Sequence, residues 1–259
     1  MQKHILQLSD FHLFADPNTR FFGVPTRNTL NDVLEAVTAM DLDFDHVIIT
    51  GDLTSDEQRV SYQTAKKILG DLVTRCLIIP GNHDDRALIR EVFPNCINGD
   101  DDSINFSVSS GSWRLLGLDT HVPGELYGLV SPKALEWLDT TLTTYKNEPT
   151  ILFQHHPPMP VGTKWVDALA LRNTDHFIDL LSHNPQIQVI SCGHVHQEFH
   201  GSLCNAVVLT TPSTSVQFKR GTDMLVCDTV PPGFRIFTLN ENKWETQVVW
   251  LDKLKYSPT

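Results

Sequence analysis

Short apolar runs that end in polar clusters alternate with helical patterns along the first part of the chain. Residues 5–8, 47–50 and 77–80 are largely apolar runs of four that are bounded by polar residues, Gly or Pro. Runs of this kind are typical of buried strands. Between them, residues 29–37 and 60–69 carry apolar side chains at helical spacing. Strand, helix and strand in this order predict an α/β fold with parallel strands.

The second half of the chain continues this alternation and then changes. Three further strands are predicted at residues 114–119, 150–154 and 187–191, and two further helices at 132–142 and 175–182. Helical spacing then stops, and we expect antiparallel strands at 207–210, 234–239 and 246–250. We therefore predict one domain over residues 1–259, in which residues 211–259 complete a second sheet.

Five of the predicted strands end in side chains that bind metals or transfer protons. These side chains are Asp10, His12, Asp52, Asn82, His83, His155, His194 and His196. Taken alone, each motif is also typical of an ordinary turn. Ligands of α/β sheets bind at the carboxyl ends of the strands, so we expect these side chains to converge. Five strand ends that all carry such groups indicate one shared site.

The chemistry of these groups indicates metal binding. Carboxylates, amide oxygens and neutral imidazoles suit Mn, Fe, Co or Zn better than metals that prefer thiolates. Even without His83, two Asp, one Asn and four His exceed the needs of one tetrahedral ion. They suit two divalent ions about 3.5–4 Å apart that share a carboxylate.

Charge and composition narrow the classes of partner that the protein is expected to bind and the compartment in which it is expected to lie. The formal net charge is -11, which argues against a general nucleic-acid binder because such proteins need a basic face. No apolar run reaches about 18 residues, so we expect no membrane span. The N-terminus lacks the apolar core of a secretory signal, and the five cysteines form no C-x-x-C pair. We therefore expect a cytoplasmic protein with reduced thiols.

The order of these motifs resembles the calcineurin-like metallophosphoesterases. The matching blocks are Asp10-x-His12, Gly51-Asp52, Gly81-Asn82-His83-Asp84, His155 and Gly193-His194-x-His196. The resemblance implies an α/β fold of the four-layer αββα type, with two mixed sheets flanked by helices. It also implies that two divalent ions, Fe, Mn or Zn, are the cofactors and that a hydroxide bridging them is the nucleophile.

The resemblance further implies a role for each site residue. The first metal would take Asp10, His12 and His196, the second would take Asn82, His155 and His194, and Asp52 would bridge them. His83 would be the catalytic group that protonates the leaving oxygen or stabilises the phosphate charge, and Asp84 would orient it. His156 should point away from His155 in an extended chain, so we interpret it as structural.

Longer stretches resemble the bacterial class III 3′,5′-cyclic-AMP phosphodiesterases. These stretches are residues 7–14, 165–173, 192–199 and 211–218. They imply hydrolysis of cyclic AMP to 5′-AMP, with no nucleic-acid or membrane partner, and they allow a homodimer. Two alternatives stay open: a catalyst for another small phosphodiester, such as a glycerophosphodiester or a 2′,3′-cyclic nucleotide, and a non-catalytic scaffold. The complete ligand set argues against the scaffold.

Substrate contacts are expected from the ligand loops and from the segment after His155. The residues are His12, Asn82, His83, Trp165, Arg172 and Asn173. Trp165 could stack on a purine or simply pack a loop, and Arg172 could contact phosphate or be a surface charge. Phe21, Phe22 and Arg27 are expected on a rim loop.

Overall fold

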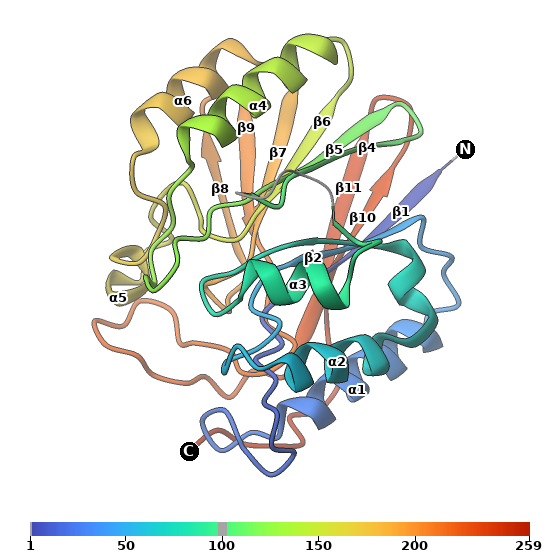
Figure 1. Cartoon of the computed structure of the whole chain (residues 1–259), viewed down its shortest axis with the longest axis vertical. Coiled ribbons are helices and arrows are strands. Elements are labelled where there is room, and N and C mark those ends of the chain that lie inside the picture. Colours follow the sequence, from blue (N-terminus) through green and yellow to red (C-terminus); the bar gives the residue numbers. More distant parts are fainter. Residues whose placement is uncertain (1, 98–102) are drawn as a thin grey trace.

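The computed structural model of the chain describes residues 2–97 and 103–259, so Met1 and residues 98–102 of the predicted domain lie outside the described residues. Two sheets lie face to face, with helices on the outer side of each (Figure 1). The strands are β1 (Lys3–Leu8), β2 (His46–Thr50), β3 (Cys76–Ile79), β4 (Phe106–Ser110), β5 (Trp113–Leu118), β6 (Thr150–Gln154), β7 (Ile187–Cys192), β8 (Phe199–Leu203), β9 (Ala206–Thr210), β10 (Gly233–Leu239) and β11 (Trp244–Trp250). The helices are α1 (Thr26–Ala39), α2 (Arg59–Leu69), the 3₁₀ helix η1 (Gly70–Arg75), α3 (Arg86–Val92), α4 (Pro132–Thr144), α5 (Lys164–Asp167) and α6 (Thr174–His183).

Both sheets mix parallel and antiparallel strands. The first has the order β11-β10-β1-β2-β3, in which β1, β2 and β3 are parallel. The second has the order β4-β5-β6-β7-β9-β8, in which β5, β6, β7 and β9 are parallel and the two edge strands are antiparallel. The predicted pair of mixed sheets is confirmed.

The alternation of side chains along each strand separates three layers of core. In β2, Val47 and Ile49 pack under α1 and α2, whereas Ile48 packs between the two sheets. A further cluster joins the second sheet to α4 and α6, as Leu152 and Phe177 illustrate. Helix, sheet, sheet and helix therefore form the four layers that the family resemblance implied.

The C-terminal strands correct one prediction. β10 and β11 do not complete the second sheet but extend the first, where β10 pairs antiparallel with β1 and places Phe237 opposite Ile5 (Figure 1). β9 is also not antiparallel to its inner neighbour. The unpredicted strand β8 forms a hairpin with β9, so β9 returns parallel to β7. Residues 211–232 then cross to the open edge of β1.

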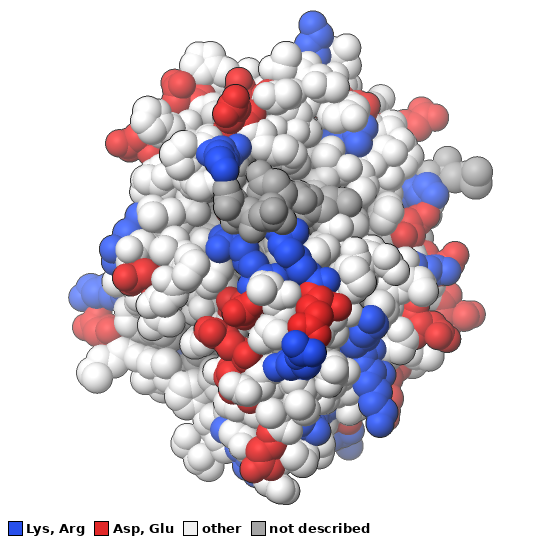
Figure 2. All heavy atoms as spheres, viewed as in Figure 1, with Lys and Arg blue, Asp and Glu red and all other residues white. Residues whose placement is uncertain are grey.

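Two further features of the fold are the distribution of charge on its surface and the length of its helices. Lys and Arg side chains are interspersed with Asp and Glu on the face shown in Figure 2. No helix within residues 2–97 and 103–259 is long and apolar enough to cross a membrane.

Candidate metal centre

The carboxyl ends of five parallel strands deliver the predicted ligands to one place. Asp10, Asp52, Asn82, His155 and His194 follow the last residues of β1, β2, β3, β6 and β7 within three positions. Several groups of these side chains have their ligand atoms within 4.8 Å of one another. The convergence predicted from the strand pattern is confirmed.

Backbone contacts hold the loops against each other beyond the strand ends. The Asp10 N–H donates to Gly51 O at 3.0 Å, and the His12 N–H donates to Asp52 O at 3.0 Å. The loops approach so closely that a Cβ on Gly81 would lie 2.2 Å from Asp52 Oδ1. Glycine is therefore required at position 81 because a Cβ would not fit, not because the backbone adopts a conformation that only glycine tolerates.

Backbone strain is concentrated in the same loops. Five predicted ligands have positive φ, namely Asp10 at 58°, His12 at 49°, Asp52 at 53°, His194 at 69° and His196 at 49°. Non-glycine residues adopt this left-handed region at a cost on the order of 1–3 kcal/mol each, and they do so most often at functional sites. The fold thus places these side chains against the local preference of the chain.

One set of ligands comprises Asp10, His12 and His196. The Nε2 atoms of the two histidines lie 3.0 Å apart, and His196 Nε2 lies 3.3 Å from Asp10 Oδ1. On the other side of each ring, His196 Nδ1 donates to Val216 O at 2.6 Å and His12 Nδ1 lies 2.9 Å from Ser55 Oγ. Hydrogen bonds of this kind hold an imidazole in the orientation that presents Nε2 to a metal.

A second set comprises Asn82, His155 and His194. Asn82 Oδ1 lies 3.1 Å from His155 Nε2 and 2.8 Å from His194 Nδ1. His155 Nδ1 donates to Thr50 O at 2.6 Å, and the buried Nε2 of His194 has no hydrogen-bond partner among the described residues. Buried polar atoms normally have partners, so this cluster is built for a ligand.

Asp52 lies between the two sets. Its Oδ2 is 3.6 Å from His12 Nε2 and 3.5 Å from His155 Nε2. Burial disfavours its charge, but the neighbouring His155 and His83 hold the pKa of Asp52 well below its usual range. Asp52 is therefore the carboxylate that two ions would share.

Burial sets the protonation of two of the ligand imidazoles, whereas for His155 burial is outweighed by the Asp52 carboxylate, which raises its pKa to about 9. Burial lowers the pKa of His12 and that of His194 well below the usual value. Both rings are then neutral at physiological pH, which is the form that binds metals. The donor set, its burial and its geometry fit a pair of divalent cations.

His83 and Asp84 lie differently from what their adjacency in sequence suggests. The His83 ring stands edge-on to His12 with centroids 5.4 Å apart, and it lines the pocket described below. The Asp84 carboxylate points the other way and accepts hydrogen bonds from Leu53 N, Gly81 N and Tyr62 Oη. The prediction that Asp84 orients the His83 ring is corrected: Asp84 joins the two ligand loops.

A pocket of about 230 Å³ opens onto the ligand cluster. Four of the predicted substrate residues line it, namely His12, Asn82, His83 and Trp165. Its other walls are apolar and comprise Phe21, Phe22, Leu126, Leu169, Phe218 and Leu225. Phe21 stacks on His12 and Phe218 stacks on His196, each with ring centroids 4.2 Å apart. The sequence motif at 211–218 contained Phe218, but its spacing did not assign it to the site.

Other residues predicted to contact substrate or to form the rim do not line this pocket. Arg172 lies 3.5 Å over the ring of Tyr127, and the Asn173 side chain exchanges hydrogen bonds with the backbone of Val130. Arg27 was expected on a rim loop but lies in the first turn of α1, from which it donates to the backbone carbonyls of Phe14 and Ala15 in the preceding loop. These side chains brace the loops around the pocket and do not line it.

The expected orientation of His156 is also wrong. The chain bends after Gln154, and the His156 ring lies 4.6 Å from that of His194. Its two nitrogens contact Thr120 Oγ1 at 2.8 Å and Leu126 O at 3.2 Å. Because both nitrogens are used inside the protein, the contacts agree with a structural role.

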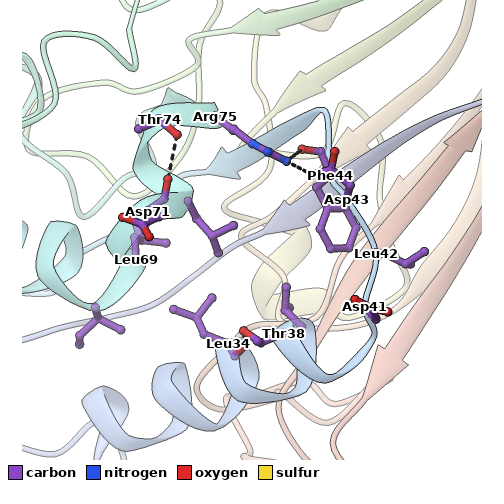
Figure 3. Close-up of a pocket in the computed structure, with 13 residues that line it drawn as sticks. Leu34, Thr38, Asp41, Leu42, Asp43, Phe44, Leu69, Asp71, Thr74 and Arg75 are labelled. Atoms are coloured by element: carbon purple, nitrogen blue, oxygen red, sulfur yellow. Dashed lines mark hydrogen bonds and ion pairs between the residues drawn. The ribbon is translucent and has the colours of Figure 1, made fainter.

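A larger pocket lies away from these histidines. It has a volume of about 640 Å³ and lies between α1 and η1, where Leu34, Phe44 and Arg75 are among its walls (Figure 3). None of the predicted site residues lines it.

Comparisons with known proteins agree with this geometry. The family model described as calcineurin-like phosphoesterase matches residues 3–198. The chain is 33% identical to the 3′,5′-cyclic adenosine monophosphate phosphodiesterase CpdA of Vibrio vulnificus, over 92% of this chain and 86% of the relative. It is 30% identical to the glycerophosphodiester phosphodiesterase GpdQ of Enterobacter lignolyticus, over 81% of this chain and 77% of the relative.

A solved structure supports the same fold. A dimetal phosphatase from Danio rerio aligns with a TM-score of 0.68 and 14% identity, over 94% of this chain and 98% of the other. The family model matches most of the chain, and the ligand motifs lie together at one edge of the fold. The chain therefore belongs to the calcineurin-like phosphoesterase family.

Proposed function

We propose that this protein hydrolyses 3′,5′-cyclic AMP to 5′-AMP at a pair of divalent metal ions. Curated relatives that cover most of the chain carry the name of this activity. The observation that carries the proposal is the aromatic pocket over the ligand cluster, where Phe21, Phe22, Trp165 and Phe218 lie beside His12 and His196. It joins a phosphate-cleaving centre to a surface suited to a flat base.

The ligand sets divide naturally between two ions, of which Fe, Mn and Zn suit the donors. Asp10, His12 and His196 would hold one ion, Asn82, His155 and His194 the other, and Asp52 would contact both. When bound, such a pair polarises phosphoryl oxygens and lowers the pKa of water.

The remaining chemistry falls to side chains on the pocket wall. Breaking the bond from phosphorus to O3′ leaves an alkoxide that needs a proton. His83 faces this space, and its backbone N–H is fixed by Asp52 Oδ1 at 2.9 Å. A positioned general acid contributes roughly 10²–10⁴-fold to rate, and we assign this role to His83.

The walls of the pocket favour a nucleobase over glycerol. Aromatic side chains stack on flat rings, whereas a glycerol substituent has no ring to stack. The indole Nε1 of Trp165 is buried and has no hydrogen-bond partner within the described part of the chain. A ring nitrogen of a base or a glycerol hydroxyl could accept this hydrogen bond, so the stacking surface is the feature that favours a base.

The test compares substrates across Trp165 variants. Trp165→Ala should lower kcat/KM for cyclic AMP about 10-fold, because losing one base–aromatic stack costs roughly 1–3 kcal/mol. Its kcat/KM for glycerophosphocholine should stay unchanged, and Trp244→Ala, which alters a tryptophan outside this pocket, should affect neither. A wild-type preference for glycerophosphocholine over cyclic AMP would contradict the proposal.

A further inference from the structure

A separate pocket of about 380 Å³ lies next to the aromatic pocket, and we call it the second pocket. The two share His196 and Phe218 as wall residues. Its remaining walls include Gln197, Glu198 and Trp250. The volume lies within the range of about 300–1,000 Å³ that is typical of small-molecule sites.

Gln197 leaves a polar group without a partner on the wall of this second pocket. Its side chain is almost fully buried, with 3% of the residue exposed. Its Oε1 accepts a hydrogen bond from Thr163 Oγ1 at 3.3 Å, but its Nε2 has no partner among the residues described. A buried unpaired donor is costly, so it points to a ligand that brings an acceptor.

The charges at this pocket favour a neutral ligand. The walls carry two carboxylates, Glu198 and Asp228, and one guanidinium, that of Arg220. Arg220 Nη1 also donates a hydrogen bond to Glu198 O at 3.3 Å, so this N–H group is not free to bind an anion. An isolated phosphate would meet net negative charge here, whereas an exocyclic amine could donate to a carboxylate.

The shape of the walls favours a flat ring. Phe218 and Trp250 supply aromatic surface, and Gln197 supplies an amide that can pair with the edge of a heterocycle. A nucleobase with an amino group, such as adenine, combines the acceptor, the donor and the flat face that these walls complement.

We propose that the second pocket binds a nucleobase, namely the second base of a linear 3′,5′-phosphodiester whose first nucleoside occupies the aromatic pocket. This inference rests on the proposed function, because the diester is cleaved at the same centre. His196, a predicted metal ligand, lines both pockets, so a diester with one nucleoside in each pocket would place its phosphate near this residue.

The reaction needs water alone as co-reactant. A water oxygen forms the new bond to phosphorus, the bond from phosphorus to the leaving nucleoside oxygen breaks, and that oxygen takes a proton. The products are one nucleoside and one nucleoside monophosphate. Cyclic AMP carries one base, so its hydrolysis leaves the second pocket unused.

The experiment measures kcat/KM of the metal-loaded enzyme for the dinucleotide ApA and for cyclic AMP. Trp250→Ala should lower kcat/KM for ApA about 10-fold by removing a stacking surface, and it should leave the value for cyclic AMP unchanged. Gln197→Ala should act in the same direction, with metal content measured to confirm that the neighbouring His196 still binds. Trp244→Ala is the matched control, because Trp244 lies on the same strand but packs against the core between the sheets.

The outcomes separate this inference from the proposed function. Turnover of cyclic AMP without turnover of ApA would overturn the inference alone. Turnover of ApA without turnover of cyclic AMP would overturn the proposed function and keep the second site. Equal losses for both substrates in Trp250→Ala would also overturn the inference, since they would reflect a general structural effect.

Discussion

Removing the Asp84 carboxylate should destabilise the protein more than removing its neighbour Asp85. Asp84 accepts hydrogen bonds from Leu53 N at 3.1 and 3.3 Å, from Gly81 N at 3.0 Å and from Tyr62 Oη at 3.2 Å. Leu53 and Gly81 belong to the loops that carry the predicted ligands after β2 and β3. Asp84→Ala leaves both buried N–H groups without an acceptor.

The size of the effect follows from these groups. Each buried donor left unsatisfied costs about 1–3 kcal/mol, so two donors cost about 2–6 kcal/mol. Burial, together with the charge of Asp52, raises the pKa of Asp84 to about 7. Because its ionised form is disfavoured in the fold, part of that loss is offset, and we expect about 2–4 kcal/mol.

Urea unfolding followed by circular dichroism measures this difference. Asp85 caps α3 by accepting from Leu88 N at 2.9 Å, and Asp85→Ala should cost about 1 kcal/mol. Asp84→Ala should also retain less metal, because its loss loosens both ligand loops. If Asp84→Ala loses no more stability than Asp85→Ala, the linking role of this carboxylate is refuted.

Three substitutions test the remaining assignments. Asp52→Ala should lose both metals and nearly all turnover, measured by elemental analysis and diesterase assay; full metal content with normal turnover would remove its bridging role. His83→Ala should keep both metals while its rate falls at least about 10²-fold, and loss of a metal would instead make His83 a ligand. Arg172→Ala should leave kcat/KM for cyclic AMP unchanged, because its guanidinium stacks on Tyr127 outside the pocket, and a large increase in KM would show that it contacts substrate.

The strands and the ligand cluster could be predicted because both depend on local pattern. Apolar runs such as 47–50 identify buried strands, and parallel strands bring their carboxyl ends to one edge. Asp52 and His155 come from different sheets, yet their side chains lie 3.5 Å apart. The shared edge explains the meeting of ligands within one sheet, and the meeting across the two sheets was implied by the family resemblance.

Long-range pairing and side-chain direction could not be predicted in the same way. The alternation in residues 234–239 fits either sheet, and the pairing with β1 depends on how the preceding segment crosses the fold. The same holds for Phe218, whose position on His196 results from that crossing. Asp84 and Arg172 were predicted to contact His83 and the substrate, but Asp84 bonds to the backbone of the ligand loops and Arg172 stacks on Tyr127.

Product analysis with cyclic AMP tests the central claim most directly. The protein loaded with Mn²⁺ or Fe²⁺ is incubated with 3′,5′-cyclic AMP, and the products are separated by chromatography, with and without EDTA. The account predicts 5′-AMP as the product and no turnover after chelation. Absence of cyclic AMP hydrolysis by a protein that holds two metals and cleaves bis-p-nitrophenyl phosphate would contradict it.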